Sequence, residues 1–122
     1  MNLLILLLSI VSAHGVIRVT PTQYNGSITY DGMYQACNDL DGLKMAWPCT
    51  QGELIGYKFW QYNLPLSWIL STNSMWNCIG YTTNSSNSMG HCLLAQKTAH
   101  YVTECSCDMK IGVCCIVYSE PM

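Results

Sequence analysis

The sequence predicts a small α+β domain in which one main helix packs on short, mostly antiparallel strands and disulfide bonds fasten the chain. Three observations lead to this fold class. One helical pattern follows a first strand-like segment, and many short strand-like segments come after it. Residues 14–122 are enough for one domain with a modest hydrophobic core. Eight cysteines follow an apolar leader, as in small secreted domains that disulfides stabilise.

The chain begins with a predicted secretory signal peptide, residues 1–13. An apolar run covers residues 3–11, and Val11-Ser12-Ala13 supplies small or short side chains where a signal peptidase reads them. The run is shorter than the roughly 20 apolar residues that span a bilayer. An uncleaved interfacial anchor is the alternative. With cleavage after Ala13, we expect residues 14–122 to form a single secreted, extracellular domain without membrane attachment.

The first elements expected after the leader are a strand, a turn and the main helix. The strand is expected over residues 15–20, which are rich in β-branched side chains. Asn25-Gly26 is a strong turn signal. The helix is expected over residues 30–40, with Thr29 or Asp31 as its cap. Its apolar face has the spacing i, i+3, i+4, i+7 and consists of Met33, Ala36, Cys37 and Leu40.

A short strand is expected directly after the helix, which Asp41-Gly42 should end. The strand covers residues 43–47 and stops at Pro48. Its pattern is typical of a half-buried strand, because three apolar residues alternate with two others: Leu43, Met45 and Trp47 with Lys44 and Ala46.

Three further strands are expected, over residues 64–70, 75–83 and 111–118. The last is the strongest, because it is apolar on both faces and therefore central in the sheet. Pro65 indicates a strand start or a sheet edge. The remaining segments are less regular: residues 49–56 irregular, residues 57–62 a strand or a packed loop, residues 84–90 a polar loop, and residues 92–95 and 99–103 short apolar pieces of either type.

Charge and composition restrict the class of partner. The net charge is −2, and the five basic residues are scattered, so neither nucleic acid nor an anionic membrane is expected. Uncharged polar residues are abundant, which suits neutral polar ligands such as sugars, or simply a solvated or glycosylated surface. Asn25 and Asn84 each begin an Asn-x-Ser sequon, so both are possible glycosylation sites if the host is eukaryotic.

The cysteines are expected to form four disulfides in an oxidising compartment. Zinc binding is not expected, because no pair of Cys-x-x-Cys or His motifs has zinc spacing. Eight cysteines allow more pairings than the residue pattern alone can choose among. They are Cys37, Cys49, Cys78, Cys92, Cys105, Cys107, Cys114 and Cys115.

A calcium-independent ligand site is conceivable around the polar loop. Trp76 and Tyr81 offer aromatic faces, and the loop at residues 84–91 offers amide groups from Asn84 and Asn87. The alternative is that both aromatic residues belong to the core and that the loop is only solvated.

Catalysis and resident cofactors are not expected. The chain has no Gly-x-Ser-x-Gly motif. After cleavage His14 would be the first residue, and its amine and imidazole, with His91 or His100, would form a copper site of the kind that secreted copper monooxygenases use. Those enzymes have larger domains, and cleavage one or two residues away would abolish the site. The acidic pairs and the Cys-x-Cys motif are better read as structural: Asp39 with Asp41, Glu104 with Asp108, and Cys105 with Cys107.

Several motifs, taken in order, resemble a known family. Residues 19–26 read VTPTQYNG, the helix contains Ala36-Cys37, and residues 42–47 read GLKMAW. Residues 77–86, NCIGYTTNSS, are similar to a Cys-x-x-Trp-Thr-Ser segment with Tyr81 in place of the Trp. Together with the final apolar strand they resemble the endostatin-like branch of the C-type lectin-like fold, which includes the collagen endostatin domain and domains of bacterial surface proteins.

This resemblance implies the fold and two of the bridges. The family's disulfides map onto Cys37–Cys115 and Cys78–Cys107, which leaves four cysteines that the family does not have. The middle of the chain, residues 48–76, is also shorter than in typical members. Calcium-dependent sugar binding is not implied, because the Glu-Pro-Asn or Gln-Pro-Asp triplet and the Trp-Asn-Asp motif are missing.

We therefore expect a secreted, non-enzymatic binding module that recognises a carbohydrate or an extracellular protein without calcium. The alternative is a structural or effector-type secreted cysteine-rich protein with no small-molecule site. The sequence leaves the oligomeric state open.

Overall fold

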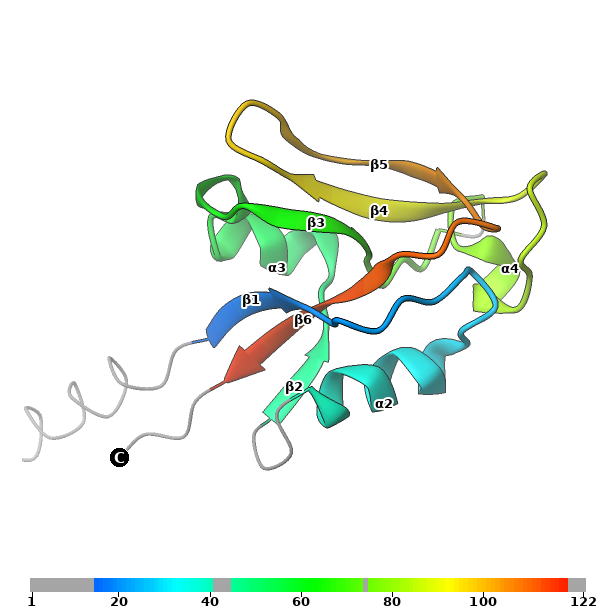
Figure 1. Ribbon diagram of the computed structural model, residues 1–122, viewed down its shortest axis with the longest axis horizontal. Coiled ribbons are helices and arrows are strands. Elements are labelled where there is room, and N and C mark those ends of the chain that lie inside the picture. The colour runs from blue at the N-terminus through cyan, green and yellow to red at the C-terminus, as the bar shows by residue number, and fades with distance from the viewer. Residues whose placement is uncertain (1–14, 41–44, 74, 119–122) are drawn as a thin grey trace, which may run out of the picture.

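The computed structural model describes residues 15–40, 45–73 and 75–118. Several predictions lie outside the described residues, namely those for the leader, His14, Asp41-Gly42, Leu43 and Lys44. Within the described part, six strands form one mixed sheet in the order β1-β6-β3-β4-β5, and β2 also pairs with β6 (Figure 1). The strands are β1 (Gly15–Val19), β2 (Met45–Pro48), β3 (Leu64–Trp68), β4 (Met89–Ala95), β5 (His100–Ser106) and β6 (Gly112–Tyr118).

Short helices accompany the sheet, so the predicted α+β class is confirmed. They are α2 (Tyr30–Asp39), α3 (Gln51–Gly56), α4 (Cys78–Tyr81) and the 3-10 turn η1 (Phe59–Gln61). No helix in the described part of the chain is long and apolar enough to cross a membrane.

Strand β6 is the centre of the sheet, as its apolar sequence predicts. It pairs antiparallel with β1 and β2, and its start pairs parallel with β3 through Ser67↔Gly112 and Trp68↔Val113. Residues 111–117 are all buried, because β6 has core on both faces. The β3–β6 pairing is parallel and the other pairings of these strands are antiparallel, so the mostly antiparallel sheet is confirmed.

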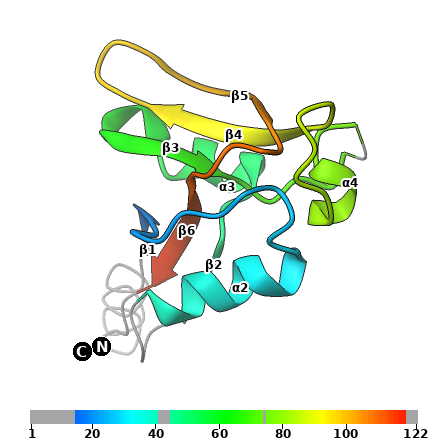
Figure 2. The ribbon, with the colours of Figure 1, turned by 45° about the vertical axis from the view of Figure 1, so that its right-hand side comes forward.

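Helix α2 follows the predicted pattern and covers one face of the sheet. Thr29 is its cap, since its hydroxyl accepts a hydrogen bond from the Gly32 amide at 3.0 Å. The predicted apolar face is buried at Met33, Ala36 and Cys37. Figure 2 shows α2 lying beneath β6 and β2. The helix therefore holds Cys37 against β6, where it bonds to Cys115.

Strand β2 is half-buried, but its buried side chains differ from the predicted pattern. Ala46 is 5% exposed and Pro48 is buried, whereas Met45 is 64% exposed. Ala46 belongs to the same core cluster as Met33 and Ala36, because a small side chain fits where α2 lies close to the strand. Trp47, on the opposite face, stacks on the ring of Tyr118 with centroids 4.6 Å apart.

The segment predicted to be irregular after Cys49 is instead the short helix α3. Thr50 and Glu53 form a capping box: the Thr50 hydroxyl accepts from the Glu53 amide, and the Glu53 carboxylate accepts from the Thr50 amide. This reciprocal capping starts the helix and directs Leu54 into the core. Of the two structures predicted for residues 57–62, the packed loop is confirmed, because η1 lies there and no strand does.

The prediction of a strand over residues 75–83 is wrong. Cys78, Ile79, Gly80 and Tyr81 all have positive φ, between 53° and 67°, so α4 is a single left-handed turn. The Asn77 side chain caps it by accepting from the Gly80 amide at 3.0 Å. The turn lets Cys78 reach Cys107 and directs Tyr81 into the core, which an extended strand with alternating faces would not do.

The remaining segments resolve into regular structure. The short apolar pieces at residues 92–95 and 99–103 belong to the β4–β5 hairpin, which is in register from Met89↔Ser106 to Ala95↔His100. The polar loop is confirmed over residues 84–88, but Met89 and Gly90 already belong to β4. Strand β3 begins next to Pro65 as predicted, yet it lies between β6 and β4 and not at a sheet edge.

All eight cysteines are paired, as predicted. Both bridges that the family resemblance implies are present, and the other four cysteines form two more. The four disulfides are Cys37–Cys115, Cys49–Cys114, Cys78–Cys107 and Cys92–Cys105.

Candidate functional site

Tyr81 is a core residue and not a ligand contact, which corrects one reading of the sequence. Its side chain is 0% exposed. The hydroxyl donates a short hydrogen bond to the Ile69 carbonyl and accepts one from the Ser71 amide at 3.0 Å. Its ring packs edge-on against Tyr30, with centroids 5.1 Å apart. Burial raises the pKa of Tyr81 above its ordinary value, so the phenol is neutral in the folded protein.

Trp76 lies at the surface and is fixed in place from both sides. Its carbonyl accepts from the His91 amide at 2.7 Å, and its own amide donates to the Asn73 carbonyl at 2.9 Å. The Trp76 and His91 rings stack with centroids 6.3 Å apart and an interplanar angle of 23°. This half-buried pair connects the segment before α4 to the start of β4.

An apolar hollow of about 310 Å³ lies on the Trp76 side of the pair. It brings together two of the predicted ligand residues, Trp76 and Asn87, whereas Asn84 is exposed on the same loop but does not line it. Two apolar side chains of the hollow are strongly exposed, Met75 at 71% and Ile79 at 66%. The hollow is lined by Met75, Trp76, Ile79, Asn87, Ser88 and Met89.

A polar hollow of about 260 Å³ lies on the His91 side. An isolated β-bridge between the backbones of Thr50 and Leu70 brings the start of α3 beside the segment after β3. Thr50 uses its hydroxyl in the capping box, and the Ser71 hydroxyl accepts from the Asn73 amide at 3.3 Å. The hollow is lined by Thr50, Gln51, Leu70, Ser71, Thr72, Asn73 and His91.

The polar hollow was not predicted, although a signal for it is present in the sequence. No residue between Lys58 and Lys97 is Asp, Glu, Lys or Arg. This stretch supplies η1, β3, α4 and β4, and with them most of the lining of both hollows. Among the described residues, neither lining contains an Asp, Glu, Lys or Arg side chain. The surface is therefore suited to an uncharged ligand.

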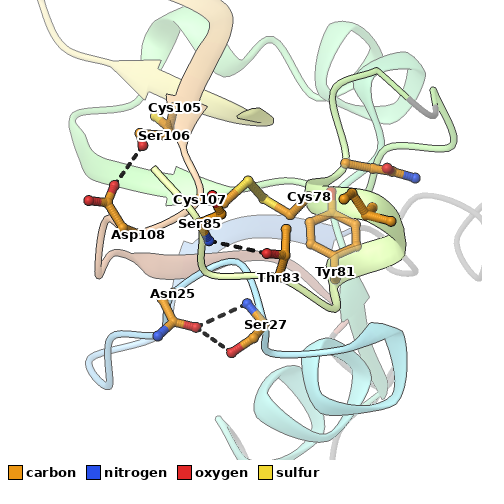
Figure 3. The surroundings of a disulfide bond; sticks show 12 residues. Asn25, Ser27, Cys78, Tyr81, Thr83, Ser85, Cys105, Ser106, Cys107 and Asp108 are labelled. Atoms are coloured by element: carbon orange, nitrogen blue, oxygen red, sulfur yellow. Dashed lines mark hydrogen bonds between the residues drawn. A yellow bond between two sulfur atoms is a disulfide. The ribbon is translucent and has the colours of Figure 1, made fainter. Parts of the chain in front are cut away.

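The disulfide that anchors α4 lies in close contact with two glycine residues. Figure 3 shows the Cys78–Cys107 bond beside Tyr81 and next to the loop that carries Thr83 and Ser85. A Cβ atom on Gly90 would lie 2.7 Å from the Cys78 sulfur, and one on Gly26 would meet the same sulfur even more closely. Only glycine allows the backbone to approach the bridge at both positions. The contact fixes α4 relative to β4, and so fixes Ile79 relative to Trp76.

The other residues considered for a site lie apart in the described structure, and the copper alternative involves His14, which lies outside it. His91 pairs with Glu104 near the start of β4, whereas His100 lies at the far end of the hairpin beside Phe59. No three His, Cys, Asp or Glu side chains among the described residues are grouped so as to hold a metal ion. Cys105 and Cys107 belong to different bridges and so are not a redox pair with each other.

The acidic side chains make local contacts. Asp39 accepts from Gln35 within α2 at 2.8 Å, and Asp108 accepts from Ser106 at 2.6 Å in the turn after β5. Asp39 and Asp108 therefore have structural roles, at a helix end and in a turn, whereas Glu104 lies in β5. Asp41 lies outside the described residues.

Both sequons lie in surface turns. The Asn25 side-chain oxygen accepts from the Ser27 amide at 3.0 Å and from its hydroxyl at 2.6 Å, as Figure 3 shows. Asn84 is exposed in the loop before β4. Glycosylation of either asparagine stays a prediction.

Comparison with protein-family models, with curated protein sequences and with solved structures gives no match for this chain. We therefore infer a function from the geometry of the described residues alone.

Proposed function

We propose that this protein is a secreted, non-enzymatic module that binds an uncharged carbohydrate without calcium. The observation that carries the proposal is the Trp76–His91 pair, which contributes one aromatic residue to each of two hollows whose described lining residues are all uncharged or histidine. Sugars are recognised by amide and hydroxyl groups together with an aromatic ring, because a sugar has many hydroxyl groups and one apolar face.

The polar hollow offers the groups that such a ligand needs. Gln51, Thr72 and Asn73 are exposed there, and their amides and hydroxyl donate and accept hydrogen bonds without introducing charge. The Asn73 side-chain oxygen accepts from the Met75 amide at 3.0 Å, which holds its amide nitrogen in a set direction. The Cys49–Cys114 disulfide, the β-bridge between Thr50 and Leu70 and backbone hydrogen bonds hold these elements in place. Little conformational entropy would therefore be lost on binding.

We further propose that the fold is that of the endostatin-like branch of C-type lectin-like domains. The pairing of the first strand with the last supports this, as does the bridge from α2 to β6. The Cys78–Cys107 bridge agrees with the second disulfide of that branch. The bridges Cys49–Cys114 and Cys92–Cys105 would then be additions in this chain.

A second candidate is recognition of an extracellular protein through the apolar hollow. The exposed Met75 and Ile79 support it, because methionine and aromatic side chains are enriched in protein interfaces. A structural or effector-type protein without a small-molecule site is the remaining alternative.

A glycan array probed with the disulfide-bonded chain tests the main proposal. We expect binding to neutral glycans that Trp76→Ala abolishes. Trp60→Ala is the matched control, because Trp60 is 41% exposed and lines neither hollow. Absence of binding to any glycan would overturn the carbohydrate proposal. A purified protein partner whose affinity falls with Trp76→Ala and Met75→Ser, but not with Trp60→Ala, would then favour the second candidate.

A further inference from the structure

We infer that the ligand is an uncharged oligosaccharide that carries N-acetyl groups, with sugar hydroxyls in the polar hollow and an acetamido group in the apolar hollow. This inference rests on the proposed function and specifies its substrate class. It follows from the difference between the two hollows, which a plain hydroxylated sugar does not explain. Four neighbouring apolar side chains would gain nothing from hydroxyl groups, but they match a methyl group: Met75, Trp76, Ile79 and Met89.

The apolar hollow also has the polar groups that an amide requires. Hydrogen bonds of the main chain fix the loop on which Asn87 and Ser88 lie: the Asn87 backbone N–H donates to the Ser85 hydroxyl at 3.1 Å, and the Ser88 carbonyl accepts from the Cys107 backbone N–H at 2.9 Å. Within the described part of the chain, neither the side-chain amide of Asn87 nor the Ser88 hydroxyl has a hydrogen-bond partner. They are available to an acetamido N–H and C=O.

The stacked pair lies between the two environments. Trp76 lines the apolar hollow, His91 lines the polar hollow, and their ring centroids are 6.3 Å apart. An oligosaccharide that lies across this pair would contact both hollows.

Charge separates this ligand class from related sugars. Within residues 15–40, 45–73 and 75–118, no Lys or Arg side chain lines either hollow, so these residues offer no cationic partner to a sulfated or carboxylated sugar. No Asp or Glu of the same ranges lines them either, so the ammonium group of a deacetylated amino sugar finds no anionic partner among them. The acetylated, neutral form is the one that complements both linings.

Titration calorimetry with three matched trisaccharides tests the inference. The ligands are the β-1,4-linked trimers of N-acetylglucosamine, of glucose and of glucosamine, each added to the disulfide-bonded chain. We expect the acetylated trimer to bind about tenfold more tightly than the other two, since it adds a buried methyl group and an amide hydrogen bond. Met75→Ser should reduce this preference. Met45→Ser should leave it unchanged, because Met45 is 64% exposed on β2 and lines neither hollow.

The outcomes distinguish this inference from the function on which it rests. Equal binding of the acetylated and glucose trimers would overturn the N-acetyl specificity and leave carbohydrate binding in place. The same holds if Met75→Ser and Met45→Ser change the preference equally. If none of the three trimers binds and the glycan array is also blank, both proposals are wrong. A preference that Met75→Ser removes and Met45→Ser retains supports the inference.

Discussion

Cys114 and Cys115 are adjacent in β6, and their side chains leave the strand on opposite faces. Cys115 bonds to Cys37 of α2, whereas Cys114 bonds to Cys49, just before α3. The two sulfur atoms therefore belong to different core clusters, one with Met33 and the other with Leu54. Because successive side chains of a strand alternate, a Cys-Cys pair in a central strand can fasten one element to each side of a sheet.

The bridges should differ in their contributions to stability. The loop closed by Cys37–Cys115 spans a sequence separation of 78, and that closed by Cys92–Cys105 spans 13. Loop-closure entropy then predicts a loss of about 4.5 kcal/mol for the double variant Cys37→Ala/Cys115→Ala and about 3 kcal/mol for Cys92→Ala/Cys105→Ala. Urea unfolding of both variants measures the difference. A larger loss for the hairpin bridge would contradict this account.

The close approach of two glycines to the Cys78 sulfur predicts a second result. Gly90→Ala should reduce the free energy of unfolding by about 1–3 kcal/mol, because the new methyl group would overlap that sulfur and the Trp68 ring. Gly26→Ala should act similarly. Gly52→Ala is the control, since nothing lies within 4 Å of its Cβ position in α3. It should stabilise the protein by about 0.5–1 kcal/mol. Equal effects at Gly90 and Gly52 would contradict the packing described here.

The left-handed turn predicts that one exposed isoleucine is unfavourable for stability. Ile79 has φ 53° and ψ 59°, a conformation that a β-branched residue rarely adopts. Ile79→Asn should raise the free energy of unfolding by about 1 kcal/mol, because asparagine tolerates this region. Ile55→Asn is matched in exposure, at 61% in α3, and should be neutral or slightly destabilising. If Ile79→Asn destabilises the protein, the turn is not strained. A stabilised variant with a weaker preference for acetylated trimers would show that the isoleucine serves binding.

The raised pKa of the buried Tyr81 phenol predicts a loss of stability at alkaline pH. Its folded-state pKa is raised above the ordinary value of about 10, so the neutral phenol stabilises the fold below that pH. As pH rises above about 10, the unfolded chain ionises first and stability falls. Tyr81→Phe should be less stable at neutral pH by about 1–3 kcal/mol, since the Ser71 amide loses its acceptor. It should also lose part of the alkaline decline. Urea unfolding at pH 7 and pH 11 measures both effects, and Tyr101→Phe, half-exposed on β5, is the control. An unchanged alkaline decline in Tyr81→Phe would contradict the assignment.

Local patterns predicted the elements whose environment is simple. The spacing of Met33, Ala36 and Cys37 is sufficient for α2, because one face of that helix is buried. The uninterrupted apolar run of β6 is sufficient for a central strand. The start of α3 could also have been predicted from the sequence, because Thr50 and Glu53 have the spacing of a capping box. The prediction for that segment nevertheless contained no helix.

Other features depend on contacts that a local pattern does not contain. Four consecutive left-handed residues run against the backbone preference of L-amino acids, so residues 78–81 read as a strand. Tyr81 and Trp76 are both aromatic and close in sequence, yet one is buried by Tyr30 and the other is held at the surface by His91. Gln51 and Asn73 line the same hollow because the β-bridge between Thr50 and Leu70 brings their two segments together.

The pairing of Gly15 with Tyr118 places the two ends of the described domain side by side. Figure 1 shows them at one end of the molecule, with α4 at the other. A linker, a neighbouring domain or a surface anchor attached at either end would therefore point away from the stacked Trp76–His91 pair. This arrangement allows the domain to be displayed on a support or inserted into a longer chain with the proposed binding surface directed outward.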